Sequence, residues 1–137
     1  MLKIPSVGSG TYEKVVTDEW IPGVIESIEY EENHDTGFKD PESGEPLIYN
    51  AVKLGFRLEG YEELHKTFWM KLSMHEKSNL AKKYLNALVE NLDPSQEFDL
   101  ERIKNMKVKV MYSQKGKYQN IEMVRPAGKK LDASLPF

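Results

Sequence analysis

The sequence contains no cysteine among its 137 residues. Disulfide bonds, thiolate nucleophiles and cysteine-ligated zinc are therefore excluded. No apolar run approaches the roughly 20 residues that a membrane-spanning helix requires, and the first ten residues lack the apolar segment of a secretory signal. We therefore expect a cytoplasmic protein that makes no contact with a membrane.

Motifs of catalysis are absent as well. The sequence has no G-x-S-x-G, H-E-x-x-H, P-loop or G-x-G-x-x-G pattern. The three histidines, His34, His65 and His75, have no partner at a spacing typical of metal ligands. The acidic residues between positions 32 and 46 do not follow the EF-hand pattern. We predict a protein that is not an enzyme and uses no cofactor or metal.

Two runs of alternating residues, Leu47–Leu58 and Lys66–Leu72, flank a polar turn. Side chains in a strand point alternately to opposite faces, so the runs predict two strands with one face in the core. The predicted inward residues are Ile48, Val52, Leu54, Phe56 and Leu58, followed by Phe68, Met70 and Leu72. The predicted outward residues are Tyr49, Ala51, Lys53, Gly55 and Arg57, followed by Thr67, Trp69 and Lys71.

The outward face combines aromatic and basic side chains. Tyr49 and Trp69 offer rings on which bases can stack, and Lys53, Arg57 and Lys71 offer cations for phosphates. A face that only contacts solvent has no need of tryptophan. We therefore interpret this face, on which the five side chains are expected to lie exposed, as a candidate surface for single-stranded nucleic acid.

The other elements follow from the same kinds of signal. Trp20–Glu31 predicts a bent strand, and Glu32–Pro46 predicts a long loop because it is rich in glycine, proline and acidic residues. Ser73 and Glu76 match a capping box, which predicts a helix that ends at Asp93 before Pro94. Helical spacing predicts that one face of it packs in the core, with Leu80, Ala81, Tyr84, Leu85, Leu88 and Leu92.

Met106–Tyr112 and Tyr118–Val124 predict two strands joined by the hairpin loop Ser113–Lys117. In the second of these strands, Ile121 and Met123 are predicted to point inward.

Charge is distributed unevenly along the chain. The net charge is −3, but residues 1–63 carry −9 and residues 64–137 carry +6. Such asymmetry can create a basic surface on an acidic protein. These sums fit equally well with charges that cluster on solvated faces and have no function.

The order strand, strand, strand, helix, strand, strand predicts an all-β fold with one inserted helix. With the aromatic residues above, this order resembles the OB-fold single-stranded DNA-binding proteins, especially the small bacteriophage type. The resemblance implies a five-stranded Greek-key barrel over residues 20–126, preceded by a leader or edge segment (1–19) and followed by a flexible tail (127–137). In this fold strands two and three and two flanking loops bind the nucleic acid. The corresponding residues in these loops or directly beside them are Phe38 and Lys39, then Tyr112, Lys115, Lys117 and Tyr118. The resemblance also implies a bacterial or phage-infected cell.

The last three residues, Leu135-Pro136-Phe137, resemble the C-terminal tip of bacterial single-stranded DNA-binding proteins. In that family the tip docks on replication and repair enzymes through the terminal ring and carboxylate. The resemblance implies the same partners here, although only Asp132 precedes the tip and Lys129-Lys130 stand where the family has acidic residues.

These observations predict binding of single-stranded DNA, without strong sequence preference, in replication, recombination or repair. Two alternatives stay open. Nothing in the sequence addresses the 2′-hydroxyl that distinguishes RNA. The chain could also be a non-enzymatic structural or interaction module, for instance of a phage, with Trp69 in a homo-oligomer interface, since tryptophan is enriched at interfaces.

Overall fold

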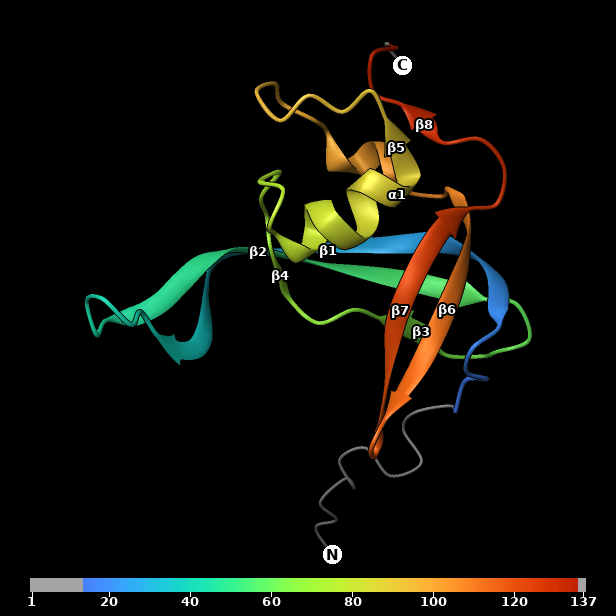
Figure 1. The fold of residues 1–137 in the computed structure, drawn as a ribbon, viewed down its shortest axis with the longest axis horizontal. Helices are drawn as coiled ribbons and strands as arrows, with labels where there is room; N and C mark the ends of the chain where they lie inside the picture. Colours follow the sequence, from blue (N-terminus) through green and yellow to red (C-terminus); the bar gives the residue numbers. More distant parts are fainter. Residues whose placement is uncertain (1–13, 136–137) are drawn as a thin grey trace, which may run out of the picture.

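The computed structural model describes residues 14–135, and its fold is an antiparallel sheet covered by a short helical segment (Figure 1). The sheet contains β1 (Trp20–Lys39), β2 (Pro46–Leu58), β3 (Leu64–Lys66), β4 (Met70–Lys71), β6 (Lys107–Lys115) and β7 (Tyr118–Pro126). The helical residues form a π-helix (Leu80–Leu85) that continues into α1 (Asn86–Leu88), and a 3₁₀ turn (Leu100–Ile103). A second, parallel pair joins β5 (Val89–Glu90) to β8 (Leu131–Asp132). The predicted all-β class with an inserted helix is confirmed.

The strands follow the order β3-β2-β1-β6-β7, and β4 also pairs with β2. The strand β6 thus returns, after the helical connection, to lie beside β1, which is the spatial order of a Greek key. Within residues 14–135 no ladder joins β7 to β3 or β4, so the sheet is not a closed barrel. The predicted closure is wrong because β3 and β4 have only three and two residues and leave no long edge for β7.

The core lies between the sheet and the helical segment. Alternation in β2 is confirmed for Val52, Leu54, Phe56 and Leu58, which are all buried. The helical segment contributes Leu80, Ala81, Tyr84, Leu85 and Leu88, the face that sequence periodicity predicts. Val108 and Val110 of β6 and Ile103 of the 3₁₀ turn complete the core.

The segment predicted as a loop, Glu32–Pro46, is instead mostly strand. The strands β1 and β2 continue beyond the body as a twisted ribbon that projects to the left in Figure 1. Only the tip is a turn, where Asp40 and Glu45 pair through a backbone hydrogen bond of 2.8 Å. Ile48, predicted inward, is 50% exposed because it lies on this ribbon, beyond the core.

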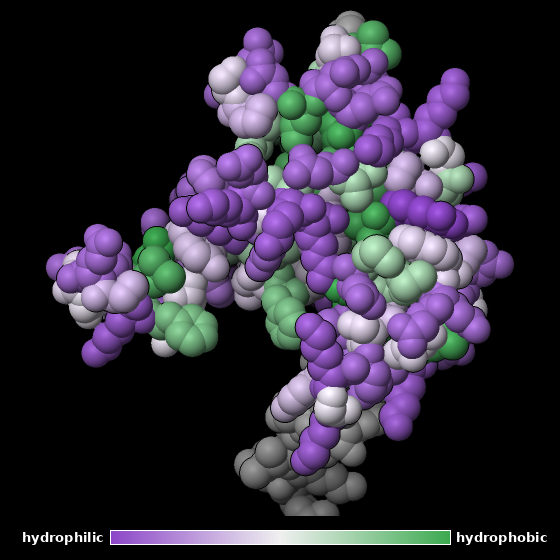
Figure 2. All heavy atoms as spheres, in the orientation of Figure 1, coloured by the Kyte–Doolittle hydropathy of each residue, from purple (hydrophilic) through white to green (hydrophobic). Residues whose placement is uncertain are grey.

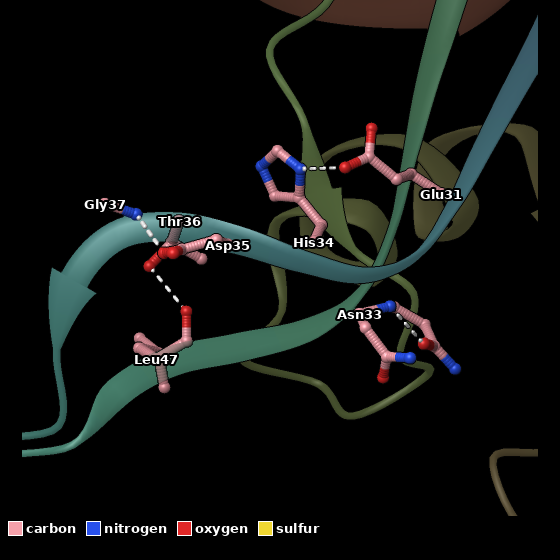
Figure 3. Close-up of polar contacts among 8 residues, drawn as sticks. Glu31, Asn33, His34, Asp35, Thr36, Gly37 and Leu47 are labelled. Carbon is pink, nitrogen blue, oxygen red and sulfur yellow. Dashed lines mark hydrogen bonds and ion pairs between the residues drawn. The ribbon is translucent and has the colours of Figure 1, made fainter.

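Bulges in β1 interrupt the alternation of inward and outward side chains, so strict alternation does not predict the ribbon. The register with β2 shifts between Glu31 and His34 and again between Asp35 and Lys39. Asn33 occupies the first shift with a φ of 52°, a left-handed conformation that asparagine tolerates, and its N–H donates to the Asn50 side chain. Beyond it, Thr36 Oγ1 donates to the Leu47 carbonyl at 2.9 Å and keeps the strands together (Figure 3).

The helix begins later and ends earlier than predicted. Ser78 caps it, because its Oγ accepts from Ala81 N at 3.1 Å and its carbonyl accepts from Lys82 N. Ser73 of the predicted capping box instead accepts from His75 N and forms a local turn. The helical segment ends at Leu88 because Val89 adopts extended geometry and pairs with Leu131.

The C-terminal tail, predicted to be flexible, packs on the body as far as the structure describes it. Leu131–Asp132 pairs with Val89–Glu90, and Arg102 donates to the carbonyls of Asp132, Ala133 and Leu135. Residues 136–137 of the predicted tip lie outside the described residues. At the other end, residues 1–13 of the predicted leader also lie outside, while Val15 is buried and Thr17 bridges to Tyr112, so residues 14–19 are an edge segment.

The two strands predicted after the helix are confirmed. Their connection is tighter than predicted, since β6 runs to Lys115, β7 begins at Tyr118, and Gly116 makes the turn with a φ of 59°. A register shift after Met111 changes the facing of β7, so Met123, predicted inward, is 46% exposed. None of the helices within residues 14–135 is long and apolar enough to cross a bilayer.

Candidate nucleic-acid interface

Trp69 lies between β3 and β4, in a three-residue segment that forms no ladder. Its ring is half-buried and contacts residues from both long strands. The His34 ring of β1 lies 5.1 Å from it, centroid to centroid, and the Lys53 ammonium of β2 lies 4.7 Å above its centroid. Trp69 therefore lies on the Lys53 side of the sheet, as predicted, and outside the core. The five outward side chains were all predicted to be exposed, but only Lys71 is; the other four are half-buried: Tyr49, Lys53, Arg57 and Trp69.

Tyr49 extends this group of rings along the base of the ribbon. It is the register partner of His34 across β1 and β2, and the two ring centroids are 6.4 Å apart. His34 Nδ1 is hydrogen-bonded to Glu31 at 3.1 Å, which fixes the orientation of the imidazole (Figure 3). We call His34, Tyr49, Lys53 and Trp69 the aromatic cluster.

The strand phase around Trp69 differs from the prediction. Thr67, predicted outward, is only 9% exposed, and its hydroxyl accepts from Leu54 N at 3.1 Å and donates to the Phe68 carbonyl at 2.8 Å. Phe68, predicted inward, is consequently 79% exposed beside Trp69, and Leu72 is 42% exposed. Met70 is buried as predicted. The buried Leu54 N–H is satisfied here by the Thr67 hydroxyl, and this contact interrupts the alternation of inward and outward side chains.

Ala51 and Gly55 were also predicted outward and are buried. Their small size lets longer neighbours cover them: a Cβ on Gly55 would meet the side chains of Ser27 and Leu64. The accessible part of the outer face is therefore narrower than predicted.

Glutamates of β1 share this face with the predicted cations. Arg57 forms an ion pair with Glu26 at 2.8 Å, and its hydrogen bond lowers the pKa of the Glu26 carboxyl. Lys66 forms one with Glu29 at 2.9 Å. Within residues 14–135, neither Lys53 nor Lys71 has a carboxylate partner. A phosphate can therefore meet Lys53 and Lys71 directly, whereas at Arg57 it must displace a carboxylate.

The other predicted site residues are not brought to the aromatic cluster. Phe38 is 72% exposed and, with Lys39, lies at the far end of the ribbon. Lys115, Lys117 and Tyr118 surround the turn between β6 and β7, on a different projection of the molecule (Figure 1).

Tyr112 is not available as part of a binding track. It is only 5% exposed, and burial raises the pKa of its phenol. The ring packs against His65 of β3 at 6.0 Å, inside the curled sheet. The prediction that Tyr112 contacts nucleic acid is wrong in this fold, because Tyr112 continues the inward alternation of Val108 and Val110 along β6.

Sequence reasoning missed His34 and Phe68. His34 was assigned to a loop, and only the extension of β1 and β2 through the bulges reveals that it faces Tyr49. Phe68 was assigned to the core by alternation, and no feature of the sequence indicates that Thr67 takes the inward place.

In residues 14–135 no group of three or more histidine, aspartate or glutamate side chains is arranged to hold a metal ion. No protein-family model matches the sequence, and no curated protein or solved structure is significantly similar to the chain. The geometry of the aromatic cluster is therefore the observation that bears on function.

Proposed function

We propose that this chain binds single-stranded DNA through the aromatic cluster, without strong sequence preference and without catalysis. The observation that carries the proposal is the environment of Trp69. An accessible indole with an ammonium 4.7 Å from its centroid and an imidazole at 5.1 Å combines a stacking surface with a cation. Proteins that bind single strands use this combination because every base has a ring face and every nucleotide has a phosphate.

Neighbouring side chains extend the proposed site along the strand edge. Phe68 adds a second exposed ring directly before Trp69, and Lys71 adds a cation two residues after it, beyond the buried Met70. Tyr49 continues the rings toward the ribbon. A strand of two or three nucleotides that stacks on Trp69 and Phe68 would place its phosphates within reach of Lys53 and Lys71.

The topology supports the same proposal. The Greek-key order, with the helical segment between β4 and β6, is compatible with an OB-fold whose barrel is open. In an OB-fold the face of the second and third strands binds oligonucleotides, and the aromatic cluster lies on this face. A role in replication, recombination or repair, with partner enzymes docked by Leu135-Pro136-Phe137, belongs to the same proposal.

The two tryptophans allow a direct test. Trp20→Phe leaves Trp69 as the only indole, and Trp69→Phe leaves Trp20, which stacks with Arg125 at 4.3 Å on another part of the sheet. We expect oligo-dT to quench the fluorescence of Trp20→Phe and to leave that of Trp69→Phe unchanged. Equal responses of the two variants would contradict stacking on Trp69.

Affinity gives a second measurement. Trp69→Ala should weaken binding of fluorescein-labelled oligo-dT about 5- to 150-fold, the range typical of one stacked base. Lys71→Ala should reduce the slope of log K against log salt by about 0.7, the value for one phosphate contact on a single strand. Lys104→Ala, an exposed lysine outside the site, is the matched control and should change neither. Comparison of oligo-dT with oligo-rU distinguishes DNA from RNA.

A protein-interaction module is the second candidate, because the ribbon exposes Phe38 and Ile48 to solvent. Sedimentation with and without oligo-dT separates the two candidates. A species of fixed mass that oligo-dT does not alter would favour the interaction module.

A further inference from the structure

The projecting part of the β1–β2 ribbon, residues 30–50, is two-stranded, and among the described residues a third segment reaches only its base, where Leu72 N donates to the Asn50 carbonyl at 2.9 Å. We call it the arm. An isolated two-stranded hairpin is at best marginally stable in water, and a third element normally covers one of its faces. The arm therefore presents backbone edges and side chains that another surface can cover.

Apolar side chains on the arm are unusually exposed. Phe38 is 72% exposed, Ile48 50% and Leu47 37%. Figure 2 shows hydrophobic surface on the projecting ribbon, interspersed with hydrophilic residues. Exposed apolar groups that cluster within a polar surround mark sites of protein contact.

The arm is also strongly acidic. It contains six carboxylates, on Glu31, Glu32, Asp35, Asp40, Glu42 and Glu45, and one cation, Lys39, for a net charge of −5 with His34 neutral. Within residues 14–135 none of these carboxylates forms an ion pair with lysine or arginine. Phosphates would be repelled by this surface, whereas a basic protein surface would be attracted.

A complementary surface exists on the same molecule. The basic hairpin, residues 107–125 of β6 and β7, carries Lys107, Lys109, Lys115, Lys117 and Arg125 against Glu122 alone, for a net charge of +4. It also exposes apolar groups, since Tyr118 is 73% and Met123 46% exposed. Its strand β7 is the last of the sheet, so this edge can accept a further strand.

We propose that the arm of one copy docks on the basic hairpin of a second copy. The arm cannot reach its own hairpin, because the two project in different directions from the body (Figure 1). Opposite charge guides the encounter, and Phe38, Ile48 and Tyr118 supply apolar contact. Two copies can exchange arms reciprocally in a closed dimer, or each arm can engage the next copy in a head-to-tail chain.

This self-association does not require the proposed DNA binding, because it uses neither Trp69 nor Phe68, although His34 and Tyr49 of the aromatic cluster lie at the base of the arm. It does use Lys115, Lys117 and Tyr118, which the sequence assigned to a nucleic-acid track. Once these residues are covered by an arm, nucleic acid has to compete for them.

The test is sedimentation of the full chain without nucleic acid, over a wide range of protein concentration. At low ionic strength we expect a mass above the 15.8 kDa of one chain, and at high salt a return to one chain. Glu42→Lys/Glu45→Lys on the arm, and separately Lys115→Glu/Lys117→Glu on the hairpin, should each weaken association about tenfold or more. A mixture of the two variants should associate again, because each supplies the charge that the other has inverted.

Glu76→Lys/Glu97→Lys, two exposed carboxylates outside both surfaces, is the matched control and should associate as the native chain does. Far-UV circular dichroism checks that every variant is folded. One chain at all concentrations in low salt, or a mixture that does not associate, would overturn the proposal.

Discussion

Thr67 decides the direction of the two aromatic residues that follow it. Its hydroxyl takes the place of a strand partner for the buried Leu54 N–H, so the chain leaves the ladder for three residues. Phe68 then points to solvent and Trp69 reaches the edge of the outer face. One buried hydroxyl thus shapes the surface on which we propose that bases stack.

Thr67→Val tests this role. Valine keeps the shape but leaves Leu54 N without a partner, so the free energy of unfolding should fall by about 1–3 kcal/mol. Thr67→Ser keeps the hydroxyl and loses one methyl group, so it should cost only about 1 kcal/mol. Urea denaturation measures both. A valine variant as stable as the native chain would mean that this hydrogen bond contributes nothing net.

At the residue scale, the sequence predicted which side chains lie near Trp69, but it did not predict that the strand is interrupted at Trp69. Tyr49, Lys53 and Trp69 were expected on one face, and the structure brings them together. The inward turn of Thr67 could not be predicted, since threonine is common at outward strand positions and its hydroxyl partner is defined only by the fold.

At the scale of the strand, β1 weakens the basic character of the face that β2 contributes. Glu26 and Glu29 pair with Arg57 and Lys66, so two of the cations already have a carboxylate. If the chain binds single-stranded DNA as we propose, the strand has to displace these carboxylates or avoid them.

Removal of one carboxylate should therefore favour the nucleic acid. We expect Glu29→Gln to raise the affinity for oligo-dT about threefold at low salt, because Lys66 is then open to a phosphate and one repulsive charge is lost. Fluorescence anisotropy measures the change, with Glu97→Gln as the control at an exposed position outside the proposed site. An unchanged affinity would indicate that the strand does not pass this part of the sheet.

The C-terminal strand β8 should depend on pH through Asp132. Its carboxylate accepts from Ser134 Oγ at 2.6 Å, Asn91 Nδ2 at 3.0 Å and Ser134 N at 2.9 Å, and these bonds lower its pKa. A lowered pKa in the folded state means that the stabilisation is present above the usual aspartate range and is lost as pH falls through the lowered value.

We therefore expect the Ala133 amide, which donates to the Glu90 carbonyl at 2.9 Å, to lose protection from hydrogen exchange below about pH 4, after correction for intrinsic rates. Asp132→Asn removes the titrating group, so its protection should stay constant over this range. Equal pH dependence in both proteins would assign the effect to another carboxyl group.

Elements with uninterrupted alternation were predictable, and elements with irregularities were not. Val108 and Val110 defined β6 correctly, whereas the arm resembles a loop because it is rich in glycine, proline and acidic residues and because two of the three register shifts of β1 lie within it. Such bulges depend on cross-strand partners, for instance Asn50 for Asn33, that a reading along the chain does not contain. The inward face of the helix was predicted correctly, but its start was not. Ser73 and Ser78 are both suitable capping residues, and only Ser78 caps the helix, which begins after it.

At the scale of the whole molecule, the charge asymmetry predicted from the two halves of the sequence has a spatial counterpart. The acidic half supplies the arm and the basic half supplies the hairpin of β6 and β7. Salt should weaken both DNA binding and self-association, so ionic strength alone cannot separate them. Variants can, because Trp69 and Phe68 belong only to the surface on which we propose that DNA binds, and Glu42 and Glu45 only to the arm.

The pairing of the arm also determines how its length can change. A strand advances about 3.4 Å per residue, so two residues added to each strand would carry the tip about 7 Å farther while every side chain keeps its face. One residue added to a single strand would instead exchange the two faces beyond it. Because the tip lies far from the core, evolution can lengthen or shorten the arm in steps of two residues without repacking the body. Variants of this fold can thus differ in reach while the stacking surface at Trp69 stays the same.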